Sequence, residues 1–162
     1  MTKKKNRIDR FDGANAFLSN FWAKNPFLWN GDVFVTGEHA FQAAKAKDPL
    51  DYFRIRDSAT PGAAKRLGRK VVLAANWDKK KLDVMEAVLM AKFNPIAQGE
   101  MAQKLVNTGD AQLVEGNTWG DVYWGVDATS GVGQNHLGKL LMLVRARIAG
   151  AETMRAGLEG LV

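Results

Sequence analysis

Two long segments repeat apolar residues at helical spacing, and no other feature constrains the fold of this chain more. In the first segment, which Asp78 opens, the repeat forms one stripe of Leu82, Met85, Leu89 and Phe93. In the second, which Asn135 caps, the apolar face consists of Leu137, Leu140, Leu141, Val144 and Ile148. This spacing places the apolar side chains on one side of an α-helix. The sequence therefore predicts that helices build most of the core.

Four shorter helices are predicted in addition, over residues 38–47, 50–57, 61–67 and 95–107. The first is rich in alanine, which favours helix. Thr60 can cap the third helix, with Pro61 at its first position and Gly68 just past its end. Asn94-Pro95 is expected to end the helix that Asp78 opens and to start the next one.

Strand signals are few. Segment 27–35 is typical of a short hairpin, because Asn30-Gly31 supplies the positive φ angles that a tight turn requires. Segment 109–135 is rich in Gly and Asp and is predicted to be a loop with one or two short strands. We therefore expect an α+β fold that is mainly helical, with a small β-hairpin or sheet. The 162 residues suit one domain, expected over 11–162, since domains run to roughly 100–200 residues.

The positive charge is concentrated at the start of the chain. Residues 1–10 hold five basic side chains and one acidic side chain, so they carry +4 of the net charge of +6. The other 152 residues hold 18 basic and 16 acidic side chains, and are therefore nearly balanced at +2. We expect residues 1–10 to be a basic, flexible tail. Such a tail is either a solvated terminus or an arm that binds nucleic acid.

Several classes of chemistry are disfavoured by composition. The chain has no cysteine, which excludes disulfides, thiolate metal sites and a cysteine nucleophile. Its two histidines, His39 and His136, do not form a metal-binding spacing, so no metal and no cofactor are expected. No apolar run approaches the ~18 residues that cross a bilayer, and no signal peptide is evident, so we expect a cytoplasmic protein without a membrane partner.

Two segments group side chains that could carry chemistry. Glu38, Gln42 and Lys45 project from one face of the predicted helix 38–47, either as a solvated charge stripe or as a polar row that faces a cleft. Segment 115–125 places Trp119 and Trp124 among glycines and acids, as in loops that bind planar ligands. The alternative is that these tryptophans fill the core beneath a long connection.

Segment 133–139 matches the first seven places of a phosphate-binding P-loop, but the eighth place is Leu140 where that loop needs Ser or Thr. A nucleoside triphosphatase is therefore rejected. The N-terminus of the helix that follows can still attract a phosphate group.

Six segments, in order, together resemble one known family: FLSNF at 17–21, EHAFQAAKA at 38–46, AKRLGR at 64–69, Trp77, ExxxWxDxxWG at 115–125, and GxNxLGxLLM at 133–142. This is the NADAR family, also called the YbiA-like N-glycosidases. The resemblance implies hydrolysis of the bond between ribose C1 and a nitrogen heterocycle. Two substrate classes are linked to the family: ribosylamino-pyrimidine phosphates of riboflavin synthesis, and ADP-ribose attached to guanine in nucleotides or nucleic acid.

The resemblance also assigns site residues. Glu38 and Asp121 match the motif carboxylates, which can stabilise positive charge on the sugar or activate water. Lys45 matches the motif lysine and can form a Schiff base with the opened sugar; Lys65 is the weaker candidate. Substrate contacts are expected from Asn20, Phe21, Gln42, Arg69, Trp77, Trp119, Trp124, Asn135 and Gly138. Among these, Arg69 and the start of the 135–148 helix are the candidates for a phosphate group.

Two other functions remain open from the sequence. A module that binds ADP-ribose or NAD without cleaving it would use the same residues. A nucleic-acid-binding protein would instead act through residues 1–10, with an affinity that falls steeply with salt.

Overall fold

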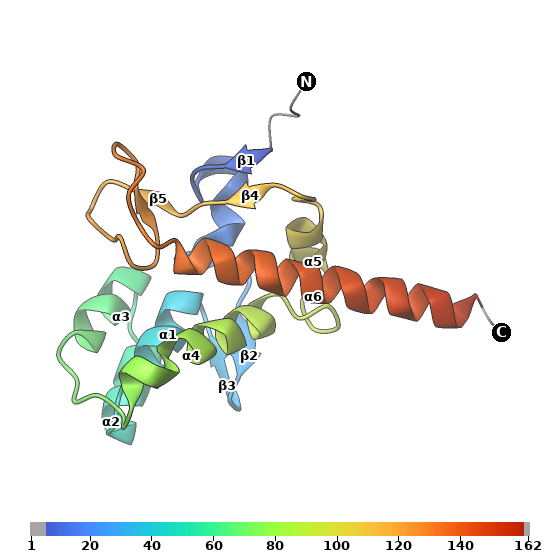
Figure 1. Ribbon diagram of the computed structural model, residues 1–162. Helices are drawn as coiled ribbons and strands as arrows, with labels where there is room; N and C mark the ends of the chain where they lie inside the picture. The colour runs from blue at the N-terminus through green and yellow to red at the C-terminus, as the bar shows by residue number, and fades with distance from the viewer. Residues whose placement is uncertain (1–5, 161–162) are drawn as a thin grey trace. The chain divides into compact units, whose positions relative to one another are not determined.

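The computed structural model describes residues 6–160, and its chain forms two compact units (Figure 1). One unit is the continuous segment Ala16–Lys92, and the other combines Met1–Asn15 with Phe93–Val162. Helices dominate the described residues and the strands are only two or three residues long, which confirms the mainly helical α+β class.

The unit Ala16–Lys92 is built around helix α1. Its elements are β2 (Phe27–Trp29), β3 (Asp32–Phe34), α1 (Gly37–Ala44), α2 (Pro49–Arg56), α3 (Pro61–Gly68) and α4 (Trp77–Lys92), preceded by the 3-10 helix η1 (Gly13–Leu18). Helix α1 packs against α2, α3 and α4. Its alanines lie in the core with side chains from the hairpin and the other helices: Phe27, Phe34, Ala40, Ala43, Ile55, Ala64 and Val88.

Local sequence signals explain where these elements begin and turn. Strands β2 and β3 pair antiparallel around Asn30 and Gly31, whose φ angles of 53° and 83° confirm the predicted hairpin turn. The Thr60 hydroxyl accepts a hydrogen bond from the backbone N–H of Ala63, so Thr60 caps α3 as predicted. Helix α1 ends at Ala44, three residues before the predicted end.

The unit formed by both ends of the chain contains α5 (Gly99–Val106), α6 (His136–Glu159) and two small parallel sheets, β1 (Arg7–Ile8) with β4 (Gln112–Leu113) and β5 (Gly116–Asn117) with β6 (Val126–Asp127). On α6 the predicted apolar face is largely buried, through Leu137, Leu141, Val144 and Ile148. Among the described residues, no helix is long and apolar enough to cross a bilayer.

Three predictions about this unit need correction. Arg7 and Ile8 belong to a paired strand, because their backbone bonds to β4, and so they are not part of a flexible tail. The remainder of that prediction falls largely on residues 1–5, which lie outside the described residues. Helix α5 begins at Gly99 because the Asn94 side chain accepts hydrogen bonds from the N–H groups of Ile96 and Ala97, which forms a turn instead. Segment 109–135 contains three short strands, not one or two.

Candidate functional site

The start of α1 is held firmly, and this positions Glu38. The Thr36 hydroxyl accepts a hydrogen bond from the backbone N–H of His39 and lies 2.7 Å from His39 Nδ1. His39 Nε2 lies 2.9 Å from the carbonyl oxygen of Ser58, which fits a ring that donates through Nε2 and accepts through Nδ1. Nε2 therefore joins α1 to the chain after α2, Nδ1 is bonded to the N-cap residue of α1, and His39 has a structural role.

Glu38 has a buried carboxylate that is hydrogen-bonded to a neighbouring side chain. Its side chain is 7% exposed, and Oε1 accepts a 2.7 Å hydrogen bond from Nε2 of Gln42, one turn along α1. Its backbone N–H donates to the carbonyl of Asn20 at 2.9 Å. Of the two sequence-based alternatives, a solvated charge stripe and a polar row that faces a cleft, the burial of Glu38 and Gln42 argues against the first.

The segment that carries Asn20 is tied to α4. Lys92, itself buried at the end of α4, donates from Nζ to the carbonyl oxygen of Ser19 at 2.7 Å. The Asn20 amide is buried as well, and its Nδ2 donates to Met85 Sδ at 3.4 Å. Together with the hydrogen bond from the Glu38 N–H to the Asn20 carbonyl, these contacts hold Asn20 between α4 and the start of α1. Lys92 was not identified as a site residue from the sequence.

Two glycines allow these amides to pack closely. A Cβ atom built on Gly68 would lie 2.0 Å from Gln42 Oε1, and one built on Gly37 would lie 2.9 Å from Asn20 Oδ1. Neither amide oxygen has a hydrogen-bond partner among the described residues. Gly68 was expected just past the end of a helix and is the last residue of α3; its place in the AKRLGR segment was a signal for a further role.

Lys45 caps the end of α1 and lies in a strongly positive neighbourhood. Its Nζ is 5.3 Å from the centre of the Phe41 ring. Burial lowers the pKa of Lys45 from its ordinary value, and the charge of Glu38 opposes that shift. Three other cations lower the pKa of Lys45 further: Lys65, Arg69 and Lys81. A lowered pKa makes the neutral, nucleophilic amine easier to form.

The predicted aromatic contacts in this unit differ in exposure. Trp77 is buried at the start of α4, with its ring centre 5.3 Å from that of Phe41. Phe41 therefore neighbours both the Trp77 ring and the Lys45 ammonium. Phe21, which follows Asn20, is 45% exposed. Trp77 thus packs in the protein, whereas Phe21 is accessible to a ligand.

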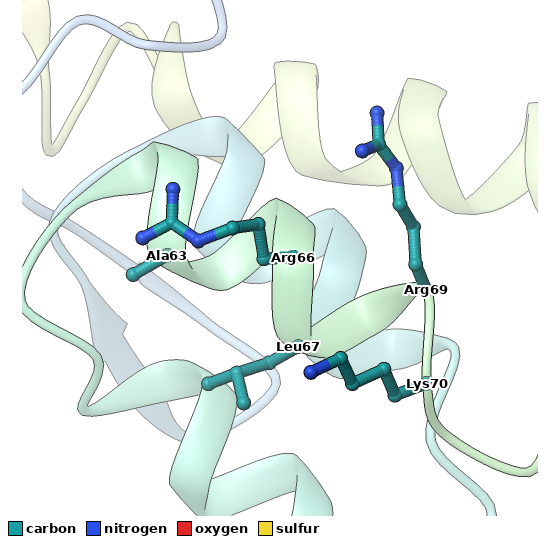
Figure 2. Close-up of a pocket in the computed structure, with 5 residues that line it drawn as sticks. All are labelled: Ala63, Arg66, Leu67, Arg69 and Lys70. Carbon is teal, nitrogen blue, oxygen red and sulfur yellow. The ribbon is translucent and has the colours of Figure 1, made fainter.

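Arg69 lines a basic pocket on α3 and the residues after it. The pocket encloses about 420 Å³ and is lined by Ala63, Arg66, Leu67, Arg69 and Lys70 (Figure 2). Its walls contain three cationic side chains and no acidic one. The sequence analysis identified Arg69 as a phosphate candidate but did not identify Arg66 or Lys70.

In the other unit, Asp121 organises the loop that precedes β6. Its Oδ1 accepts hydrogen bonds from the backbone N–H groups of Tyr123 and Trp124, at 3.2 and 2.9 Å. Asn117 holds the same loop, because its side chain accepts from the N–H of Asp121 and donates to the Asp121 carbonyl. Asn117 was not identified from the sequence, although asparagine in a glycine-rich turn is a signal for such bonds.

The loop gathers three rings on one side. The ring centre of Tyr123 lies 5.1 Å from that of Trp124 and 4.5 Å from that of His136. Trp124 is half-buried beside them, whereas Trp119 is 67% exposed. The two tryptophans that the sequence treated alike therefore differ. Trp124 belongs to a ring cluster, and Trp119 presents a free aromatic face.

Asn135 is bound at both ends of its amide. It adopts a left-handed conformation with φ of 53°, accepts a hydrogen bond from the Glu115 N–H at 3.0 Å and donates to the Leu113 carbonyl at 2.9 Å. Gly138 packs against the same atoms, because a Cβ there would lie 2.2 Å from the Leu113 oxygen. Both residues thus hold α6 against the strand β4.

At the predicted phosphate site at the start of α6, three backbone amides are already bonded within the chain. The backbone N–H groups of Asn135, His136 and Leu137 all donate to carbonyl oxygens of the preceding loop, at 3.1, 3.3 and 3.0 Å. Amides occupied in this way cannot bind an anion at the helix N-terminus.

The predicted site residues therefore form two groups, one in each unit. Asn20, Phe21, Glu38, Gln42, Lys45, Arg69 and Trp77 belong to the first unit, and Trp119, Asp121, Trp124, Asn135 and Gly138 to the second. Across residues 6–160, no cluster of three His, Asp or Glu side chains is arranged to hold a metal ion.

Comparisons with known proteins extend over both units. A family model described as the NADAR domain matches residues 8–149. N-glycosidase YbiA of Escherichia coli strain K12 is 41% identical over 134 residues, covering 82% of this chain and 81% of that protein. The NMR structure of E. coli YbiA matches with a TM-score of 0.80 and 35% identity, covering 93% of this chain and 90% of that chain. The riboflavin biosynthesis protein VVA0006 of Vibrio vulnificus is 30% identical over 139 residues, which are 85% of this chain and 36% of that protein.

Proposed function

This chain belongs to the NADAR family of N-glycosidases, and from that premise we propose that it hydrolyses the bond between ribose C1 and a nitrogen heterocycle through Glu38, Lys45 and Asp121. The observation that carries the proposal is the polar row on α1. It combines a buried carboxylate, held by Gln42, with a lysine whose pKa is lowered.

The carboxylates suit the charge that the reaction creates. Breaking the C1–N bond leaves positive charge on the sugar ring, in an oxocarbenium-like transition state. Glu38 offers a negative charge in a place that excludes water, where electrostatic stabilisation is strongest. Asp121 uses Oδ1 to order its own loop, which leaves Oδ2 for the sugar or for the attacking water.

Lys45 gives the reaction a covalent route. The neutral amine of Lys45 can attack C1 as the C1–N bond breaks, and the heterocycle leaves with the proton that the amine gives up. Ring opening converts the adduct into an imine at C1, and water then adds to that carbon, releases ribose and restores the amine. The proposal assigns no step to a metal ion or a cofactor.

The substrate is proposed to be nucleotide-like, from one of two classes. One class is ribosylamino-pyrimidine phosphates, which the name of the Vibrio relative favours. The other is ADP-ribose joined to guanine, free or in nucleic acid. We expect exposed Phe21 and Trp119 to stack on the heterocycle, and a cytoplasmic location remains part of the proposal.

Release of the free base from each substrate class tests the proposal. The protein is incubated with ADP-ribosylated guanosine and with a ribosylamino-pyrimidine phosphate, and the base is measured by chromatography. We expect turnover of one class by the wild type and a large loss in Glu38→Gln and Asp121→Asn, which preserve shape and hydrogen bonding. Binding of both compounds without base release would contradict hydrolysis and would instead support a module that only binds ADP-ribose or NAD.

Borohydride reduction tests the covalent route separately. We expect a sugar adduct on Lys45, located by peptide mass, and no turnover in Lys45→Ala. Lys47→Ala is the matched control, since Lys47 is an exposed lysine two residues away and should retain activity. Turnover in Lys45→Ala equal to that of the control would exclude the Schiff base while leaving the carboxylate chemistry intact.

A further inference from the structure

Phe21 lies on a tight turn formed by the four residues Ser19–Trp22. The carbonyl oxygen of Ser19 accepts a hydrogen bond from the backbone N–H of Trp22 at 3.2 Å, which closes the turn. The Ser19 hydroxyl also accepts a hydrogen bond from the N–H of Phe21 at 3.1 Å. Of the two central residues, Asn20 is buried and Phe21 is exposed. The turn therefore presents the Phe21 ring to solvent.

Two side chains of α4 hold this turn from the interior of the protein. Lys92 is only 1% exposed, and its Nζ donates to the Ser19 carbonyl oxygen at 2.7 Å. The Asn20 amide donates to Met85 Sδ at 3.4 Å. Met85 and Lys92 lie on the same face of α4, because residues two helical turns apart share a face. Since the Asn20 carbonyl also accepts from the Glu38 N–H, the turn is fixed to both α4 and α1.

The charge of Lys92 is more than packing requires. Removing an ammonium group from water is costly, and a methionine at this position would fill much of the same space without that cost. An ammonium group, however, forms a short charge-assisted hydrogen bond, roughly twice as strong as one between neutral groups. Lys92 therefore holds the Ser19 carbonyl more firmly than the Trp22 N–H alone would.

We propose that Lys92 is a positioning residue, which holds the turn so that the Phe21 ring stacks on the heterocycle of the substrate. The inference rests on the proposed function in taking a heterocycle as the ligand of Phe21. Because Lys92 is buried, it acts through the turn and not by contact with the substrate. Its loss should weaken substrate binding and leave the chemical step nearly unchanged, since the stack forms before the C1–N bond breaks.

The kinetics of base release test this role in Lys92→Met, which removes the ammonium group and keeps an unbranched side chain. We expect KM to rise about threefold to tenfold, because part of the stacking is lost, and kcat to change less than about twofold. Phe21→Ala should raise KM about tenfold, since stacking on an aromatic ring contributes about that much to the binding of a base. The double variant Phe21→Ala/Lys92→Met should have the KM of Phe21→Ala, because Lys92 acts only through the ring.

Ile55→Val is the control for a general loss of stability. Ile55 is a core residue of α2, so its truncation weakens the core and should leave KM within about twofold of the wild type. Circular dichroism verifies that each variant is folded, and Lys92→Gln, whose amide is shorter and uncharged, replaces Lys92→Met if the latter is unfolded. An unchanged KM, a fall in kcat alone, or KM effects that multiply in the double variant would overturn the positioning role.

Amide hydrogen exchange distinguishes failure of this inference from failure of the proposed function. The Trp22 N–H shares the Ser19 carbonyl with Lys92, so it should exchange faster in Lys92→Met than in Ile55→Val, with or without turnover. Unchanged exchange at Trp22 would refute the anchor. If the wild type binds the two substrate compounds without releasing base, the reaction is refuted, and the same variants are compared by Kd. Binding of neither compound would overturn the stack on Phe21.

Discussion

Replacing Gly68 by alanine should both destabilise the protein and disturb the hydrogen bond that holds the Glu38 carboxylate. The new Cβ would lie 2.0 Å from Gln42 Oε1, 2.9 Å from its Cδ and 3.1 Å from its Cβ. The closest approach is about 1.5 Å short of a normal contact, so either Gln42 must leave its position or α3 must shift. Movement of Gln42 breaks its hydrogen bond to Glu38 and leaves a buried carboxylate with one partner fewer.

The size of the effect follows from three contributions. Overpacking a filled site costs about 1–3 kcal/mol, and losing a hydrogen bond to a charged group costs about 1.5–3 kcal/mol. The two costs do not simply add, because moving the Gln42 side chain breaks the hydrogen bond but relieves the overlap. Alanine gains up to about 1 kcal/mol of helix propensity over glycine. We expect Gly68→Ala to lower the free energy of unfolding by about 1–3 kcal/mol.

Gly62→Ala is the matched control because Gly62 lies in the same helix. A Cβ there has Arg66 Nη1 as its nearest neighbour, at 3.6 Å, which is an ordinary contact. This variant should therefore be as stable as the wild type or slightly more stable. Urea unfolding measures both free energies, and base release measures the activity, which should fall only in Gly68→Ala. Equal stability and equal activity of the two variants would refute the packing argument.

Three further predictions test other parts of the structure. Burial and the hydrogen bond to Asp32 raise the pKa of Tyr52 to about 12. In a pH titration followed by tyrosinate absorbance, the wild type should show a transition near that pH that is absent from Tyr52→Phe. The stability that Tyr52 contributes should decline as the pH rises above about 10. Because the pKa of Lys45 is lowered in the folded protein, the unfolded chain binds more protons than the folded one just below pH 10.5. The free energy of unfolding of the wild type, relative to that of Lys45→Met, should therefore rise with pH in this range. A difference in free energy that does not change with pH would contradict the lowered pKa. Asn135→Ala should lower the free energy of unfolding, measured in urea, by about 2–4 kcal/mol, because it removes two hydrogen bonds and puts alanine at a positive φ. Asn135→Gly should lower it less, because glycine tolerates the positive φ. Equal losses in the two variants would exclude the backbone contribution.

Short-range backbone chemistry made much of the fold predictable. The hairpin at Asn30-Gly31 and the cap at Thr60 depend on residues within one turn of each other, and both are as the sequence indicated. The same local logic failed at Asn94, where the side chain forms a turn in place of the predicted helix start. The sequence pattern there matched both the turn and the helix start.

The sequence by itself determined which residues share a helix face and which segments carry acids, amines and rings. It placed Glu38, Gln42 and Lys45 in one row because helical periodicity depends only on spacing. Spacing could not decide whether that row meets solvent. The tertiary structure decided it: Gly68 of another helix allows α3 to cover Gln42, and Glu38 and Gln42 are buried, whereas Lys45 stays partly exposed.

At the start of α6, too, the sequence determined one part of the structure and the tertiary fold decided another. The sequence determined that a helix begins near Asn135, but its amide binds Leu113 and Glu115, more than a turn away along the chain. The first amides of α6 are taken by loop carbonyls, which no periodicity encodes. The N-terminus of a helix can bind an anion only if distant segments of the chain do not already bond its N–H groups. Whether they do depends on long-range hydrogen bonds that form only in the folded structure.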